Sequence, residues 1–90
     1  MLTAVYTRQF ERDIRRLQRR GKDMEELKAV VRTLLGEEPL GPLHRDHRLV
    51  GSYQGRRECH IEPDWLLIYK REANAIVFER SGTHADLFRG

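Results

Sequence analysis

The sequence lacks the features that mark secreted and membrane proteins. Its 90 residues include a single cysteine, Cys59, which cannot form an internal disulfide and is typical of a reducing compartment. The longest purely apolar run, residues 65–69, is far shorter than the roughly 18 residues that cross a membrane. The N-terminus also reaches Arg8 before the apolar core of a signal peptide has formed. These absences predict a cytoplasmic protein without a membrane partner.

The chain is short and polar, which limits what it can build. Its length and a mean hydropathy of −0.70 predict one small domain that spans residues 1–90. A domain of this size buries only about 60–65% of the surface of its unfolded chain, which leaves little room for a deep cavity. A two-domain enzyme is excluded, and any active site is expected on a shallow surface.

The positive charge is concentrated near the N-terminus. The chain has a net charge of +3, but residues 8–22 alone hold seven basic side chains against two acidic ones, a local charge of +5. The basic residues are Arg8, Arg12, Arg15, Arg16, Arg19, Arg20 and Lys22. Such a stripe on a small domain is typical of a protein that binds a polyanion, most often nucleic acid. The alternative is an ordinary solvated helix face.

The N-terminal part predicts a strand and a helical hairpin. Residues 2–6 are apolar, with the β-branched and aromatic members typical of a short strand. Thr7 can cap a helix whose apolar positions follow the helical period, and Gly21 ends that helix. Asp23 can cap a second helix, which ends at Gly36. The short connection between the two helices favours antiparallel packing.

The C-terminal half predicts an antiparallel sheet. After a loop over residues 37–45, turn signals separate short runs that are expected to form strands at 49–50, 56–61, 64–70 and 75–80. Alternation places Glu58 and His60 on a polar face that is expected to be exposed, and Cys59 on the apolar face. The tail after Gly82 is expected to be too short for another element. The fold class is therefore α+β, with the helices packed on the sheet.

The histidines are the main indication of an enzyme, because imidazole can exchange protons near neutral pH. All four lie in the C-terminal half, at His44, His47, His60 and His84. No three potential ligands show a spacing typical of a metal site, so we expect no metal and no cofactor. Cys59 alternates with apolar residues and is expected to be a buried small hydrophobe rather than a nucleophile.

The residue types suit RNA cleavage without a metal. That reaction needs a base for the 2′-hydroxyl, positive charge on the phosphate and an acid for the leaving 5′-oxygen. Candidates for these roles are His60, Asp64, Arg80 and His84. Trp65 and Phe88 can stack on bases, although Trp65 is equally suited to the core. From the residues alone, a basic RNA-binding domain and a small nuclease are supported equally.

Four ordered blocks of sequence carry a family resemblance. They read DHRL at residues 46–49, GSYQGRR at 51–57, HIEPDWLLIY at 60–69 and ERSGTHADLF at 79–88. With these blocks, the chain resembles the YafQ-type branch of the RelE toxin superfamily. The basic helical hairpin agrees with the same family, so the resemblance spans nearly the whole chain. It implies a RelE-like microbial ribonuclease fold.

The resemblance also implies an activity and a set of functional residues. Members are toxins of bacterial type II toxin–antitoxin pairs, and this branch cuts messenger RNA in the ribosomal A site. The implied acid–base set is His47, His60, Asp64 and His84, with His84 expected to be the general acid. Arg80 is expected to steady the phosphate. Trp65 and Phe88 match aromatic positions near the RNA, and Arg12, Arg15, Arg16 and Arg19 would seat the protein on ribosomal RNA.

Partners and competing functions follow from the same resemblance. A free toxin would stop its host's growth, so a cognate antitoxin with an acidic, apolar-dotted segment is expected. The toxin alone is expected to be a monomer and to form a hetero-oligomer with its antitoxin. The alternatives are a ParE-type inhibitor of DNA gyrase, which shares the fold but lacks the histidine set, and a plain RNA-binding module. His44 matches no family position and is expected to be an exposed loop residue.

Overall fold

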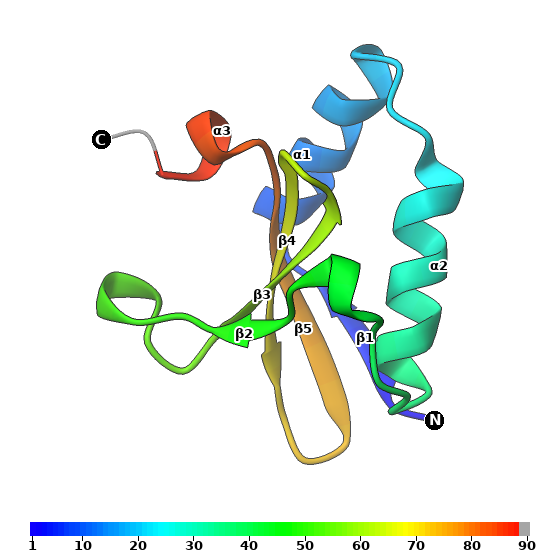
Figure 1. The fold of residues 1–90 in the computed structure, drawn as a ribbon, viewed down its shortest axis with the longest axis vertical. Coiled ribbons are helices and arrows are strands. Elements are labelled where there is room, and N and C mark those ends of the chain that lie inside the picture. The colour runs from blue at the N-terminus through cyan, green and yellow to red at the C-terminus, as the bar shows by residue number, and fades with distance from the viewer. Residues whose placement is uncertain (89–90) are drawn as a thin grey trace.

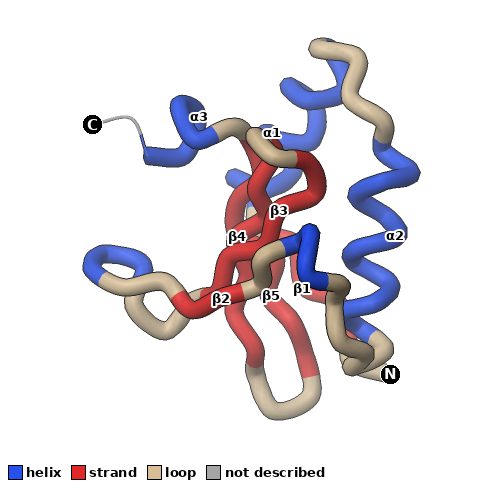
Figure 2. The backbone as a smooth tube through the Cα atoms, viewed as in Figure 1, coloured by secondary structure: helices blue, strands red, loops and turns tan. Residues whose placement is uncertain are grey.

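The computed structural model describes residues 1–88, apart from the side chain of Ser52. It contains one five-stranded sheet with helices on both faces (Figures 1 and 2). The elements are β1 (Thr3–Tyr6), α1 (Arg8–Arg19), α2 (Met24–Leu35), η1 (Pro42–His44), β2 (His47–Arg48), η2 (Gly51–Tyr53), β3 (Arg57–Glu62), β4 (Trp65–Arg71), β5 (Ala75–Gly82) and α3 (His84–Phe88). The predicted α+β class is confirmed.

The ends of the two long helices agree with the predicted caps. The Thr7 hydroxyl accepts the backbone N–H of Phe10 at 3.0 Å, and the Asp23 carboxylate accepts the N–H of Glu25 at 2.9 Å. Gly21 has a φ of +82°, which a residue with a side chain rarely adopts, and the chain reverses there between α1 and α2 (Figure 1). Within residues 1–88 no helix is long and apolar enough to span a bilayer.

The sheet is mixed rather than purely antiparallel. Its strand order is β1-β5-β4-β3-β2, and the pairs from β5 to β2 are antiparallel. β1 pairs in parallel with β5, so that Thr3 lies opposite Ala75. The antiparallel sheet predicted for the C-terminal half is confirmed, and β1, whose pairing was not predicted, joins it in parallel because α1 and α2 form the connection between β1 and the other strands.

The outermost strand, β2, begins earlier than predicted. It covers only His47–Arg48 and pairs with β3, whereas the sequence favoured a strand at 49–50. Leu49 instead packs against Leu66 and Ile68, and Gly51, with a φ of +72°, starts the short turn η2. The Leu49 N–H still donates to the Arg56 carbonyl at 2.9 Å, so the pairing ends where Gly51 turns the chain.

Strand β4 separates two clusters of buried side chains. Trp65, Leu67 and Tyr69 point toward α1 and α2 and belong to the main core. Leu66 and Ile68 point to the opposite face, where Leu87 of α3 covers them. Cys59 lies fully buried in the main core, as predicted, and burial raises the pKa of its thiol to about 12.

The C-terminal tail forms a helix, contrary to expectation. The Asp86 carboxylate accepts the N–H of Thr83 at 3.0 Å, while the Thr83 hydroxyl accepts the N–H of Asp86 at 3.1 Å. This reciprocal pair is a capping box, which starts a helix even when only one turn follows. The spacing of threonine and aspartate in the sequence contained this signal. α3 consequently holds His84 against the sheet.

Candidate active site

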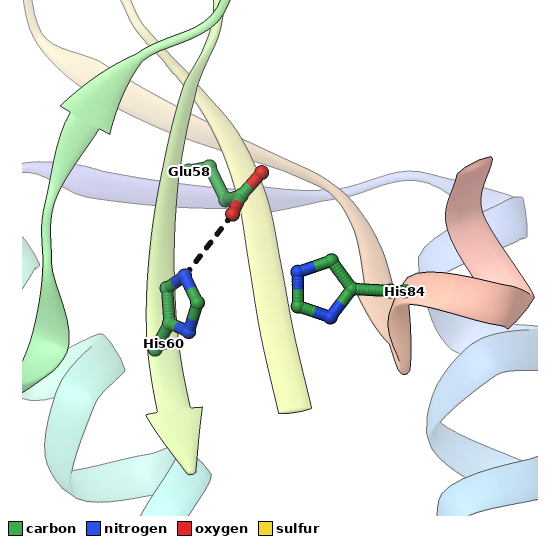
Figure 3. Close-up of side chains that lie close together, drawn as sticks. All are labelled: Glu58, His60 and His84. Carbon is green, nitrogen blue, oxygen red and sulfur yellow. Dashed lines mark ion pairs between the residues drawn. The ribbon is translucent and has the colours of Figure 1, made fainter. Parts of the chain in front are cut away.

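The histidines His47, His60 and His84 gather on the α3 face of the sheet. β2 and β3 supply the first two, and α3 supplies the third (Figure 3 shows His60 and His84). The ring centroids of His60 and His84 lie 5.9 Å apart, and those of His47 and His60 lie 6.5 Å apart. Three potential proton-transfer groups from distant parts of the chain therefore share one shallow surface.

Asp64 orients the ring of His84. Its Oδ1 accepts the backbone N–H of His84 at 3.0 Å and lies 2.7 Å from Nδ1 of the ring, which donates to it. These two hydrogen bonds hold the pKa of the Asp64 carboxyl below its usual value. With Nδ1 engaged, His84 presents Nε2 to the site, and its side chain is about half exposed. The pair has the geometry of a carboxylate-oriented acid–base catalyst.

The other two histidines are fixed by backbone carbonyls. Nδ1 of His47 lies 2.6 Å from the carbonyl oxygen of Arg45, and Nδ1 of His60 lies 3.2 Å from that of Pro63. A carbonyl only accepts, so both Nδ1 atoms carry a proton and both Nε2 atoms face inward. The side chain of His47 is half exposed, whereas that of His60 is almost buried.

Glu58 is the functional candidate that the sequence analysis missed. Its carboxylate Oε1 lies 3.3 Å from Nε2 of His60 and 4.0 Å from Nε2 of His47. Glu58 and His60 were expected on an exposed face, but they retain only 6% and 9% exposure. That expectation is wrong because α3 and η2 lie over this face of the sheet. A carboxylate two residues from a histidine on one strand was the available signal.

Glu58, His60 and His84 also form a set of potential metal ligands. One ligand atom from each lies within 4.8 Å of the others (Figure 3). The sequence showed no three-ligand spacing, because the sheet and α3 bring these ligands together from positions that are far apart in the chain. Nitrogen and carboxylate oxygen suit zinc or copper, so this surface has the donors to hold such an ion.

Arg80 is held beside the cluster by a buried aspartate. Its Nε and Nη2 donate to Asp13 at 2.8 and 3.2 Å, and Asp13 also accepts the N–H of Ser81 at 3.0 Å. The Asp13 side chain is fully buried, and its carboxylate raises the pKa of Arg80. Asp13 was missed as well, although it lies on the apolar stripe of α1 one residue before Ile14, where a charge needs a partner.

The two aromatic candidates have different environments. Phe88 is 43% exposed, lies 6.4 Å from the His84 ring and makes an edge contact with Tyr53 at 5.6 Å. Trp65 is completely buried, and its indole N–H donates to the Ser81 hydroxyl at 3.0 Å. The expectation that Trp65 contacts RNA is therefore corrected: it is a core residue, the alternative that its apolar strand had left open.

The basic stripe is only partly available to a ligand. Arg12, Arg15 and Arg19 are exposed on α1, but Arg16 is partly buried against Asp13 at 3.1 Å and Asp86 at 3.8 Å. Arg20 also binds Asp86, and Lys22 binds Glu62 at 3.0 Å. Three of the seven cations in the stripe thus serve internal ion pairs.

His44 is not the exposed loop residue that was expected. It is half-buried, and its Nδ1 donates to the carbonyl of His60 at 2.6 Å. The hydrogen bond anchors η1 to β3 on the strand that carries Glu58 and His60. His44 therefore stabilises the strand that carries the site, although its own ring is not part of the histidine cluster.

The family described as bacterial toxin of type II toxin–antitoxin system, YafQ, matches residues 2–89. The chain belongs to this family. The resemblance drawn from the four sequence blocks is thereby confirmed, and the ParE-type alternative is set aside.

Individual relatives agree over nearly the full length. The chain is 45% identical over 84 residues to the mRNA interferase toxin YafQ of Escherichia coli K12, which covers 92% of this chain and 91% of the relative. It is similar to the crystal structure of the E. coli DinJ–YafQ complex, with a TM-score of 0.91 and 43% identity. The match covers 98% of this chain and 99% of the chain in that structure. A metal-bound toxin from Helicobacter pylori has a TM-score of 0.92, 39% identity and coverage of 98% and 100%.

Proposed function

We propose that this protein is a ribosome-dependent endoribonuclease that cleaves messenger RNA in the A site by metal-independent acid–base catalysis. The observation that carries the proposal is the Asp64–His84 pair facing the His47, Glu58 and His60 cluster. The E. coli relative is named an mRNA interferase, which agrees with RNA as the substrate. The protein would act in the cytoplasm, where translating ribosomes are found.

His84 acts as the general acid. Its Nδ1 is occupied by Asp64, so the proton for the leaving group comes from Nε2, on the exposed side of the ring. The Asp64 carboxylate stabilises the imidazolium form that this role requires. Phe88, on the same helical turn, offers its exposed face to a base next to the scissile phosphate.

His47 acts as the general base. Its Nδ1 donates to the Arg45 carbonyl, which leaves the lone pair of the neutral ring on Nε2. His60 is less suited to this role, because its Nε2 lies 3.3 Å from Glu58 and its Nδ1 faces the Pro63 carbonyl. Both ring nitrogens of His60 are thus engaged, so this ring would position Glu58, while Arg80 would supply the positive charge for the phosphate.

The reaction balances with these groups alone. The RNA 2′-hydroxyl loses its proton to His47 and attacks the adjacent phosphorus, while the bond from phosphorus to the 5′-oxygen breaks. His84 gives its proton to that oxygen, which leaves as a hydroxyl, and the other product is a 2′,3′-cyclic phosphate. Arg80 neutralises the charge on the non-bridging oxygens.

A cognate antitoxin is the proposed protein partner. The E. coli YafQ relative has been solved as a complex with DinJ, described as a toxin–antitoxin complex. Arg12, Arg15 and Arg19 are exposed on α1, so an acidic antitoxin segment that orders on binding could cover this basic surface together with the active site. In its absence the toxin is proposed to be a monomer.

The proposal is tested by primer extension on a defined messenger RNA in a purified translation system. Wild type and His84→Ala are compared, with and without ribosomes, and each toxin is also tested after it has been treated with EDTA and the chelator removed, because ribosomes themselves need Mg²⁺. Cuts at codon positions that need ribosomes, survive EDTA treatment of the toxin and vanish in the variant are expected. Equal effects of wild type and His84→Ala would favour a plain RNA-binding module. Loss of cuts after EDTA treatment of the toxin would assign the Glu58, His60 and His84 set to a catalytic metal instead.

A further inference from the structure

Four arginines line a hollow outside the histidine cluster. This hollow, here called the arginine basin, has a volume of about 660 Å³. Its lining residues are Arg48, Leu49, Val50, Gln54, Gly55, Arg56, Arg57 and Arg71. They come from β2, the loop through η2, the start of β3 and the end of β4 (Figure 1). Among the described residues no carboxylate lines the basin, so guanidinium groups supply most of the polar atoms on its wall.

Three of the four guanidinium groups are held from outside the basin. Nε of Arg56 donates to Glu79 at 2.6 Å, and Nε of Arg57 donates to Asp46 at 3.2 Å. Nη2 of Arg71 donates to Glu37 at 2.8 Å. Because Glu79, Asp46 and Glu37 do not line the hollow, they orient the guanidinium groups without filling it. A fixed guanidinium loses little side-chain entropy when it binds a ligand.

Arg48 supplies charge that the protein does not neutralise. Within residues 1–88 no carboxylate oxygen lies within 4.0 Å of its guanidinium, and the residue is exposed. Among the described contacts, Nε of Arg57 donates to Asp46. Its two terminal nitrogens can therefore donate to a ligand. The planar donors of arginine match the oxygens of a phosphate. The basin therefore favours a ligand that carries phosphate groups.

The basin and the histidine cluster are built on the same two strands. His47 and Arg48 are neighbours in β2, and Arg57 and Glu58 are neighbours in β3. Successive side chains of a strand point to opposite faces, so Arg48 and Arg57 point away from the face that carries His47 and Glu58, while Leu49 of the basin packs on that face. β2 is an edge strand and only two residues long, so the basin lies round this edge. A nucleic-acid strand can therefore pass round this edge from one surface to the other.

We propose that the arginine basin binds the sugar–phosphate backbone of the RNA strand that is cleaved at the histidine cluster. This inference rests on the proposed function. Val50, 85% exposed beside the arginines, offers an apolar contact to a ribose or base. The basin collects cations that are scattered over residues 48–71, so the concentration of charge at residues 8–22 does not reveal it. The RNA would thus contact two basic surfaces.

The test compares two charge reversals of equal size. Arg48→Glu with Arg71→Glu alters the basin, and Lys28→Glu with Arg32→Glu makes the same change in net charge on α2. The probe is a short fluorescein-labelled single-stranded RNA with 2′-O-methyl riboses, which cannot be cleaved because the nucleophile is blocked. Its anisotropy is measured at several salt concentrations, and circular dichroism checks the fold of each variant.

The basin variant is expected to raise the Kd for RNA by at least about tenfold over the α2 variant and to reduce the salt slope by about 1.4, or about 0.7 for each lost phosphate contact. Equal Kd values for the two variants would overturn the proposal. So would weaker binding of the antitoxin with unchanged RNA binding, which would make the basin an antitoxin surface. Since the probe is never cut, a failure of wild type to cleave messenger RNA would count against the proposed function alone.

Discussion

Arg20 of α1 and Asp86 of α3 form a two-point ion pair, with Nη1 2.7 Å from Oδ2 and Nη2 3.1 Å from Oδ1. The same carboxylate caps α3 at Thr83. One aspartate therefore fixes the helix that carries His84 and Phe88 to the first helix of the chain. Because α3 is a single turn, this attachment determines where both side chains lie.

Asp86→Asn and Arg20→Ala are expected to lower the rate of RNA cleavage at saturating substrate by about ten- to hundredfold, because small displacements of a catalytic group are costly. Arg20→Lys, which keeps the charge but not the second hydrogen bond, should have a smaller effect. The matched control is Arg19→Ala, an exposed neighbour, which should raise KM and leave kcat unchanged. An Asp86→Asn enzyme with wild-type kcat would show that the ion pair does not position α3.

Stability should fall in acid because of the same aspartate. The Arg20 guanidinium holds the pKa of Asp86 well below its usual range, and two hydrogen bonds from His84 lower that of Asp64. A carboxyl with a depressed folded-state pKa stabilises the protein above its unfolded value of about 4, and this contribution is lost as the pH falls through the folded-state value. Urea unfolding at pH 7 and at about pH 3 measures the difference. Asp86→Asn should show a smaller loss between the two than wild type does.

Trp65→Phe is expected to lower the stability of the fold and to leave RNA binding unchanged. It removes the hydrogen bond to Ser81 and leaves a small void, which should lower the free energy of unfolding by about 1–2 kcal/mol. Its Kd for uncleavable RNA should match that of wild type. Phe88→Ala should show the reverse, with weaker RNA binding by about 1–3 kcal/mol and little change in stability. Weaker RNA binding by a stably folded Trp65→Phe would contradict the burial of this ring.

The buried carboxylate of Glu58 should matter as much as the histidines around it. His84→Gln is expected to reduce cleavage by about 10²–10⁴-fold, the usual contribution of a general acid. Glu58→Gln removes the charge that faces His60 and His47 and should also reduce cleavage strongly, without loss of RNA binding. Single-turnover cleavage rates, beside the Kd for uncleavable RNA, separate the two effects. Wild-type rates for Glu58→Gln would limit this residue to a structural role.

Local signals in the sequence predicted where the helices begin and end better than they predicted which strands and side chains pair with one another. Thr7, Asp23 and Gly21 act through neighbours in the chain, so the limits of α1 and α2 could be read directly. Three other features depend on residues that are far away in sequence. They are the burial of Glu58, the ion pair between Asp13 and Arg80, and the parallel pairing of β1 with β5. The family resemblance supplied the histidine set, but it did not indicate Glu58.

The parallel pairing of β1 with β5 also has a consequence for synthesis. Thr3 lies opposite Ala75, so the first strand to leave the ribosome waits for the last strand of the sheet before it has a partner. Contacts this distant in sequence form late in folding, because a long loop must close first. His84 follows β5 and is made later still. The groups of the candidate site therefore come together only after the chain has been made as far as α3.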